Sequence, residues 1–142
     1  MKEKFVIAHK RAALVYAELS SCVRRKVGCV IVKNVTPIAI GYNGTPAGED
    51  NCCEIDNVTK PNVIHAEDNA LRKLTKSSES AEGAVMFVTT VPCAPCASRI
   101  IDAGISKVYY VDVYRNADGI DYLQKRNIDV EQLPSELFPD LN

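Results

Sequence analysis

Residues 85–111, VMFVTTVPCAPCASRIIDAGISKVYYV, hold two apolar, β-branched runs on either side of a segment with helical features. The runs over 85–89 and 108–111 have the composition of buried strands. The segment over 92–103 opens with proline, which suits the first helical turn, and is followed by Gly104, the expected C-terminal cap. The stretch therefore predicts a strand, a helix and a strand in succession.

The rest of the chain continues this alternation on both sides. Periodicity and composition predict further helices and strands: helices over 4–20, 65–74 and 117–126, and strands over 27–32, 37–41 and 128–130. Asn34 and Pro37 favour a hairpin between the first two strands, with Thr36 in its turn. We therefore expect an α/β fold of three layers, α-β-α, whose mixed five-stranded sheet is largely parallel, with one antiparallel pair and helices on both faces.

Length and composition narrow the class of protein. The 142 residues suffice for one domain over residues 1–142, and 46% hydrophobic and 25% charged residues are ordinary for a globular protein. We expect a cytoplasmic protein with no membrane contact, because the chain shows neither a bilayer-spanning apolar run nor a secretory signal. The net charge of −1 disfavours nucleic acid as a partner.

Two short motifs carry the chemistry. His65 opens one predicted helix, and Cys93 and Cys96 open another. One imidazole and two thiolates leave a fourth tetrahedral position open, which is typical of catalytic zinc, so we expect one catalytic Zn²⁺ per chain. Such zinc lowers the pKa of its bound water to about 7. Glu67, two residues after His65, can move the proton of that water without binding the metal.

Each motif alone has a plainer interpretation. A C-x-x-C pair is often half of a structural zinc site or a redox pair, and a histidine at a helix start is often a cap or a packed side chain. Together, H-x-E and P-C-x-x-C form the signature of zinc-dependent nucleobase deaminases, which favours catalysis.

The chain resembles the deoxycytidylate (dCMP) deaminase family, of phage and bacterial type, within the cytidine deaminase-like superfamily. Besides the zinc motifs, the resemblance rests on SCVRRKVGCVIVK at 21–33, GYNGTPAG at 41–48, NCC at 51–53 and the segment 83–110, and it extends over about residues 5–130. It implies a cytidine deaminase-like fold and the hydrolysis of dCMP to dUMP and ammonia, which supplies dUMP for thymidylate synthesis.

The resemblance also implies substrate contacts. Asn43 would bind the sugar hydroxyl, Thr45 would help to hold the nucleotide, and Tyr114 would lie on the sugar-phosphate side. We also place Ala66, between the metal ligand and the acid, among the substrate-binding residues. A plain turn is the alternative interpretation of the loop that contains Asn43 and Thr45.

The 5′-phosphate needs a cationic partner. Arg24 and Lys26 flank the entry to the first strand, and two-residue spacing would place both on one strand face. We expect these two residues to bind the phosphate. A solvated surface run is the alternative.

The resembled family forms homo-hexamers that dCTP activates and dTTP inhibits, and we expect the same here, with Mg²⁺ accompanying the triphosphate. Candidate effector contacts are the loop backbone at Gly44 and the basic residues Arg72, Lys73 and Lys76. A solvated helix face is the alternative for the basic residues.

The remaining cysteines are expected to be buried, inert thiols: Cys22, Cys29, Cys52 and Cys53. A reducing cytoplasm disfavours disulfides. Eleven residues separate Cys53 from His65, and none of them is histidine. We therefore expect no second zinc site.

Three other functions compete with dCMP deamination. A tRNA adenosine deaminase shares the zinc motif but needs a basic RNA-binding surface, whereas this chain is slightly acidic. A free-nucleoside cytidine deaminase usually carries cysteine in place of His65. An inactive, zinc-stabilised binding module would have no use for Glu67.

Overall fold

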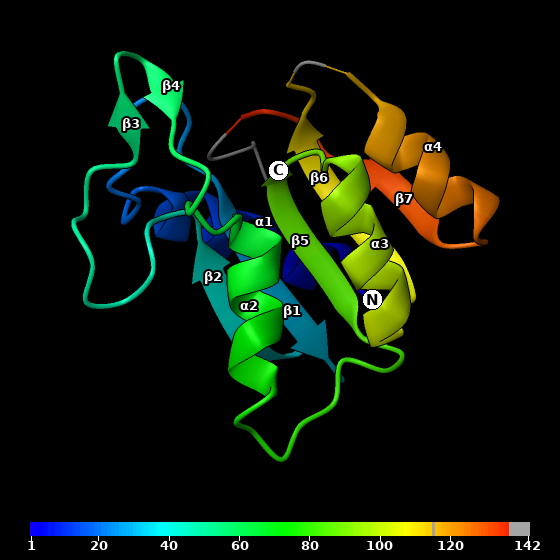
Figure 1. Cartoon of the computed structure of the whole chain (residues 1–142). Coiled ribbons are helices and arrows are strands. Elements are labelled where there is room, and N and C mark those ends of the chain that lie inside the picture. Colours follow the sequence, from blue (N-terminus) through cyan, green and yellow to red (C-terminus); the bar gives the residue numbers. More distant parts are fainter. Residues whose placement is uncertain (115, 137–142) are drawn as a thin grey trace.

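The computed structural model describes residues 1–114 and 116–136 (Figure 1). Its elements in chain order are α1 (Glu3–Ala17), β1 (Gly28–Lys33), β2 (Thr36–Tyr42), β3 (Glu54–Ile55), β4 (Val58–Thr59), α2 (Ala66–Leu74), β5 (Val85–Thr90), α3 (Ala94–Ala103), β6 (Lys107–Asp112), α4 (Asp118–Lys125) and β7 (Asp129–Gln132). No helix among the described residues has both the length and the apolar character needed to cross a membrane.

In the described part of the chain, the main sheet has five strands in the order β2-β1-β5-β6-β7. The pairs β5–β6 and β6–β7 are parallel, whereas β1 is antiparallel to both β2 and β5. The mixed five-stranded sheet is thus confirmed, but the expectation of one antiparallel pair in a largely parallel sheet is wrong. The crossover through α2 does join strands of the same direction, β2 and β5, but β1 lies between them and opposes both.

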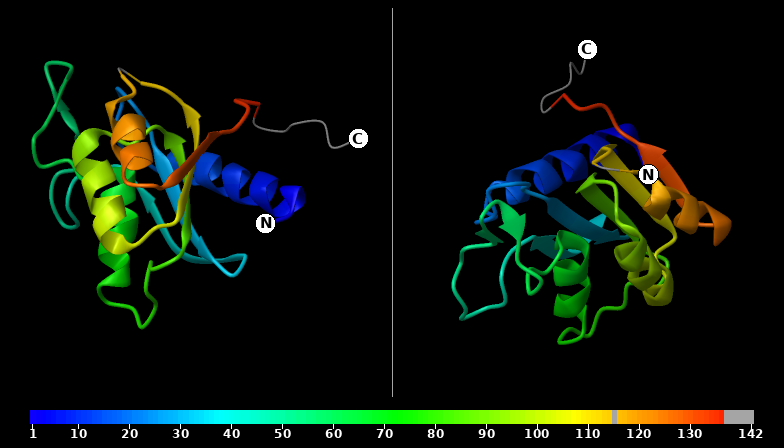
Figure 2. Two further views of the ribbon diagram at one scale, coloured as in Figure 1. Left: turned by 90° about the vertical axis from the view of Figure 1, so that its right-hand side faces the viewer. Right: turned by 45° about the horizontal axis from the view of Figure 1, so that its top comes forward.

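Helices cover both faces of the sheet, as predicted (Figure 2). On β1, Cys29 and Ile31 belong to the core shared with α2, α3 and α4, while Val30 and Val32 belong to the core under α1. All four side chains are buried. A strand whose successive residues are buried on opposite faces is the expected result for a sheet between two helical layers.

Several boundaries differ from the sequence predictions. The helix expected over 4–20 ends at Ala17, and Thr36 begins β2 rather than lying in the turn. The turn consists instead of Asn34 and Val35, both with positive φ (51° and 68°). Gly104 is the left-handed C-cap of α3, as predicted.

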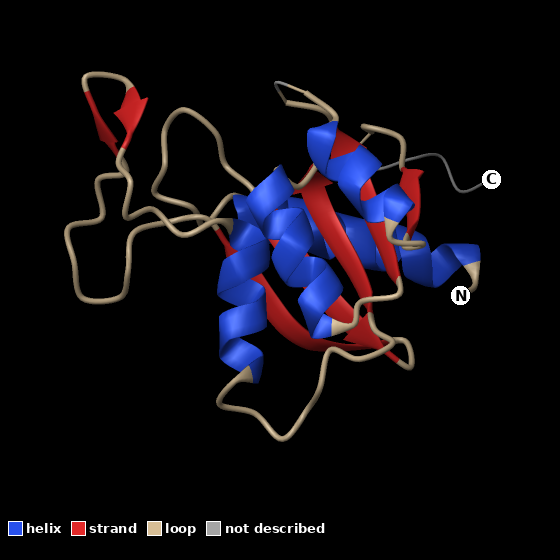
Figure 3. Ribbon diagram, turned by 45° about the vertical axis from the view of Figure 1, so that its right-hand side comes forward, coloured by secondary structure: helices blue, strands red, loops and turns tan. Residues whose placement is uncertain are grey.

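The hairpin of β3 and β4 was not predicted and projects from the body of the molecule (Figure 3). Its strands have only two residues each, and Ile55 and Val58 are exposed, so neither length nor alternation marks them in the sequence. Asp56 and Asn57 form its turn with positive φ values of 52° and 63°, which suits the twist of a two-residue hairpin loop.

A disulfide joins Cys22 to Cys53 and ties this projecting segment to the approach to β1. The expectation of four buried thiols is therefore wrong for these two cysteines and also for Cys52, which is exposed; Cys29 is a buried free thiol, as predicted. The fold explains the pairing, because the carboxylate of Glu54 accepts the backbone N–H groups of residues 23 and 24 and holds the two segments together.

Candidate active site

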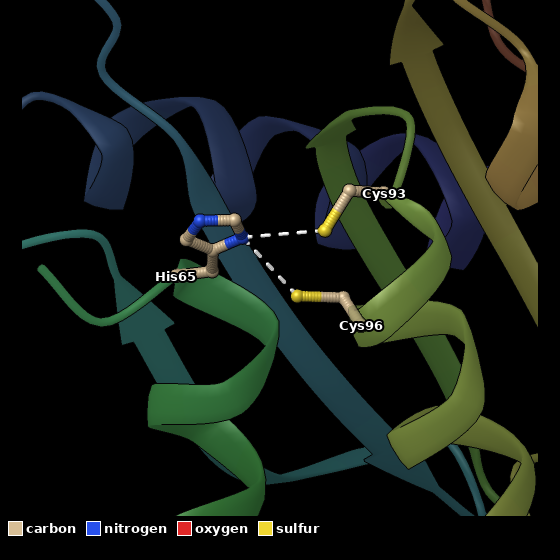
Figure 4. Close-up of side chains that lie close together, drawn as sticks. All are labelled: His65, Cys93 and Cys96. Carbon is tan, nitrogen blue, oxygen red and sulfur yellow. Dashed lines mark hydrogen bonds between the residues drawn. The ribbon is translucent and has the colours of Figure 1, made fainter. Parts of the chain in front are cut away.

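The candidate site lies where the N-termini of α2 and α3 meet, at the carboxyl end of β5 (Figure 4). His65 immediately precedes α2, and Cys93 holds the equivalent position before α3. The Sγ atoms of Cys93 and Cys96 lie 3.5 and 3.2 Å from Nδ1 of His65. All three ligand atoms are within 4.8 Å of one another. The structure therefore brings together the three side chains that the sequence singles out.

These three side chains suit a zinc ion. Zinc binds thiolate sulfur at about 2.3 Å and imidazole nitrogen at about 2.0–2.1 Å in a tetrahedral arrangement. Ligand atoms separated by the 3.2 to 3.5 Å found here can surround such an ion with little movement. Three protein ligands leave the fourth tetrahedral position for water or substrate, which is the pattern of a catalytic site.

The three groups also influence one another's ionisation. Hydrogen bonds with Cys96 and His65 lower the pKa of Cys93 to about 4. The hydrogen bond with Cys93, together with burial, raises the pKa of Cys96, and the bond to Cys93 raises the pKa of His65. One thiolate thus forms readily, whereas a second negative charge beside it is disfavoured until a cation balances it.

Glu67 lies in the first turn of α2 and is only 4% exposed. Burial raises the pKa of its carboxyl from 4.5 to about 7. A carboxyl that titrates near neutral pH can both accept and donate a proton under ordinary conditions. Glu67 lines the same cavity as His65 and Cys93, so it can exchange protons with a molecule held there.

Small residues set the position of α2 against the sheet. A Cβ atom at Gly41 of β2 would lie 2.4 Å from the carbonyl oxygen of Ala66 and 2.6 Å from the nitrogen of Ala70. Both alanines are fully buried. The helix therefore contacts the strand backbone directly, and this contact determines where His65 and Glu67 stand.

A cavity of about 340 Å³ opens beside this candidate metal site and is lined by two of its side chains, His65 and Cys93. Of the residues predicted to contact substrate, Asn43, Ala66 and Tyr114 line this cavity, whereas Thr45 does not. The side chain of Asn43 is oriented by the backbone: its Oδ1 accepts the N–H of Val27 at 2.9 Å, and its Nδ2 donates to the carbonyl of residue 25 at 2.7 Å.

Among the described residues, the arginine or lysine in the cavity wall is Arg25, not Arg24 or Lys26. The expectation that Arg24 and Lys26 share a strand face is wrong, because β1 begins only at Gly28. The backbone N–H of Arg24 donates to Glu54, and the ammonium of Lys26 donates to the carbonyl of residue 20 at 2.6 Å.

Arg25 reaches the carboxyl ends of two parallel strands. Its Nη2 donates to Thr90 Oγ1 at 3.1 Å and pairs with Asp112, and its guanidinium lies 4.7 Å from the ring centroid of Tyr114. Sequence periodicity could not find this residue. The rule that α/β proteins bind ligands at the carboxyl ends of parallel strands points to Thr90 and Asp112, but no local signal in the sequence links Arg25 to them.

The residues predicted to contact an effector lie outside the cavity lining. Gly44 forms a bridge with Ile64, and Arg72 pairs with Asp68 at 3.2 Å. Lys73 donates to the carbonyl of residue 40 at 2.7 Å, and Lys76, just beyond α2, is exposed. Their effector role stays a prediction.

Comparison with known proteins places these motifs in a family. The model described as "Cytidine and deoxycytidylate deaminase zinc-binding region" matches residues 3–112. Among solved structures, the dCMP deaminase from cyanophage S-TIM5 in complex with dCMP and dUMP superposes with a TM-score of 0.92 and 46% identity, over 94% of this chain and 99% of that chain. This match confirms the predicted cytidine deaminase-like fold.

Two curated relatives have related names. The deoxycytidylate deaminase of Enterobacteria phage T4 is 33% identical, with 92% of this chain and 90% of the relative covered. The deoxycytidylate deaminase of Saccharomyces cerevisiae is 35% identical over 86% of this chain. The match spans only 42% of the length of the yeast protein.

Proposed function

Because the chain belongs to the cytidine and deoxycytidylate deaminase family, we propose that it hydrolyses dCMP to dUMP and ammonia with one zinc ion. The observation that carries this proposal is the cluster of His65, Cys93 and Cys96 beside a cavity that His65, Cys93 and the buried Glu67 line together. The 46% identity to a phage dCMP deaminase in complex with dCMP and dUMP supports the choice of substrate.

His65, Cys93 and Cys96 would hold the zinc, which when bound makes water a competent nucleophile at neutral pH. Glu67 then carries the proton transfers. It takes both protons of the water that attacks C4 of cytosine, one after the other, and delivers the first to ring N3 and the second to the leaving amine. In the zinc-free site, burial raises the pKa of this carboxyl to about 7. One water is consumed, and one ammonia leaves.

The substrate contacts follow from the cavity lining. Asn43 binds the sugar hydroxyl, Ala66 lies against the base, and Tyr114 lies on the sugar-phosphate side. Arg25 replaces Arg24 and Lys26 as the proposed 5′-phosphate ligand, because it is the arginine that lines the cavity within residues 1–114 and 116–136. Its side chain is 34% exposed, so part of the guanidinium can still contact a bound anion.

The family resemblance supports a homo-hexamer whose activity dCTP, with Mg²⁺, increases and dTTP decreases. The candidate effector contacts remain the loop at Gly44 and the basic residues Arg72, Lys73 and Lys76. Light scattering and dCMP rate curves with and without each triphosphate test this proposal. A monomer contradicts the assembly, and a hyperbolic curve that neither triphosphate moves contradicts the regulation.

A substrate panel tests the activity itself. Ammonia release is measured from dCMP, dCTP, deoxycytidine and tRNA, and zinc content is measured on the same preparation. We expect one zinc per chain and a kcat/KM that is highest for dCMP. Preferred turnover of tRNA would support the tRNA deaminase alternative, and zinc binding without turnover of any of the four would indicate a binding module.

A further inference from the structure

Three side chains form a closed hydrogen-bonded group at the edge of the cavity. Thr90 ends β5 and Asp112 ends β6, and the two residues are register partners in neighbouring parallel strands. The hydroxyl of Thr90 donates to Asp112 Oδ1 at 3.0 Å and accepts from Arg25 Nη2 at 3.1 Å. Arg25 Nη2 also pairs with the same carboxylate oxygen.

This group restrains a side chain that comes from an irregular segment. Arg25 lies before β1, which begins at Gly28. Its backbone is therefore outside the strand ladder that would fix the direction of its side chain. Strand ends supply that restraint through Thr90 and Asp112, and the ring of Tyr114 supplies a flat surface 4.7 Å from the guanidinium carbon. An arginine that is ordered before its ligand arrives loses less conformational entropy on binding.

We propose that Asp112, assisted by Thr90, is a positioning residue that holds the Arg25 guanidinium in the cavity wall to receive the 5′-phosphate of the substrate. The inference rests on the proposed function and deepens it. Asp112 acts through Arg25 and does not itself contact the nucleotide.

A positioning role predicts that removal of Asp112 weakens the binding of dCMP, whereas a simple charge argument predicts that it strengthens this binding. A carboxylate close to the phosphate site repels the phosphate and competes with it for Arg25. If repulsion dominates, variants without this charge bind dCMP more tightly than the wild type. If positioning dominates, they bind dCMP more weakly. The sign of the change therefore separates the two interpretations.

The variants Asp112→Ala, Asp112→Asn and Thr90→Val test the proposal. Asp112→Ala removes the acceptor and should raise the KM for dCMP about tenfold. Asp112→Asn keeps an acceptor oxygen and should raise this KM roughly threefold. Thr90→Val loses the bridging hydroxyl and should raise the KM for dCMP about as much as Asp112→Asn does. In each variant KM should change more than kcat, and the preference for dCMP over deoxycytidine should narrow.

The matched control is Asp129→Asn. Asp129, on β7, pairs with Lys107 at 3.2 Å and does not line the cavity. Removal of its charge should therefore leave the KM for dCMP unchanged. A KM for dCMP that is unchanged or lower in Asp112→Ala overturns the proposal. An equal loss of kcat/KM on dCMP and deoxycytidine overturns it as well, because a purely structural defect does not depend on the phosphate.

Calorimetry separates this inference from the proposed function. Binding of dUMP, which needs no turnover, should be about tenfold weaker for Asp112→Ala than for the wild type. A wild type that binds dUMP but does not deaminate dCMP would defeat the proposed function alone. Equal dUMP affinity in the wild type and Asp112→Ala would defeat the positioning role alone.

Discussion

The two sides of the cavity are built in different ways. The metal side consists of His65 and Glu67 on α2 and Cys93 and Cys96 on α3, at helix starts that pack on the sheet. The nucleotide side consists of Arg25, Asn43 and Tyr114, which lie outside regular elements.

Hydrogen bonds between side chains and backbone, together with the Cys22–Cys53 disulfide, hold the nucleotide side in place. Its loops therefore depend on a few contacts, whereas the metal side depends on the packed core. Under the proposed function, the reaction would take place on the packed side of the cavity and the nucleotide would be selected by the side made of loops.

Loss of a metal ligand should have the largest effect of all. Cys93→Ser removes one of three ligands, so zinc content should fall well below one per chain and kcat should drop roughly a thousandfold or more. Metal analysis and ammonia release measure both quantities. The exposed Cys52 provides the control, since Cys52→Ser should retain zinc and activity. Full zinc content in Cys93→Ser would contradict the assigned ligand set.

The disulfide should account for much of the stability of the nucleotide side. It closes a loop with a sequence separation of 31, so its reduction, or Cys22→Ser, should lower the free energy of unfolding by about 3–4 kcal/mol on the chain-entropy estimate. Denaturant unfolding with and without a dithiol measures this change. Thiol titration of the unreduced, unfolded, zinc-free protein should find the four free cysteines. Six reactive thiols before reduction would show that the bond is absent.

Burial of Glu67 should make the stability of the zinc-free protein depend on pH. Its pKa rises from 4.5 to about 7 on folding, so the folded state binds this proton more tightly than the unfolded state does. The resulting stabilisation is complete below the unfolded pKa and is lost as the pH rises through about 7.

Between acidic and mildly alkaline pH, the free energy of unfolding of the zinc-free wild type should therefore fall by on the order of 2–3 kcal/mol more than that of Glu67→Gln. Urea unfolding of both proteins at several pH values measures the difference. Identical pH dependence in the two proteins would show that Glu67 is not buried as described.

A comparison of Arg25→Ala with Arg24→Ala tests which arginine on the nucleotide side binds the phosphate. Arg25→Ala removes a cation that lines the cavity and should lower kcat/KM for dCMP by roughly tenfold to a hundredfold, with a much smaller effect on deoxycytidine. Arg24→Ala is the matched control and should change kcat/KM for dCMP little. A larger effect of Arg24→Ala would restore the interpretation drawn from two-residue spacing.

The same contrast explains what the sequence could predict. His65, Glu67, Cys93 and Cys96 stand within two short motifs at helix starts, so local signals were enough to place them together. Two-residue spacing favours Arg24 and Lys26 over Arg25, but strand periodicity does not apply to these residues because they precede β1. Only tertiary contacts with the ends of β5 and β6 bring Arg25 to the cavity.

Two features of the fold depended on long-range contacts in the same way. The antiparallel pairing of β1 with β5 follows from the position of β1 between β2 and β5. No local sequence pattern predicts that position. The pairing of Cys22 with Cys53 follows from contacts between segments about thirty residues apart in the chain. The position of each cysteine in the sequence does not reveal its partner.

The central claim is that Glu67 transfers protons at a zinc site that deaminates dCMP, and Glu67→Gln tests it most directly. The glutamine keeps the size of the side chain but cannot accept the proton of water. We expect kcat for dCMP to fall by about 10²–10⁴-fold or more, while zinc content stays near one per chain. A Glu67→Gln variant that retains zinc and deaminates dCMP within about tenfold of the wild-type rate would contradict this mechanism.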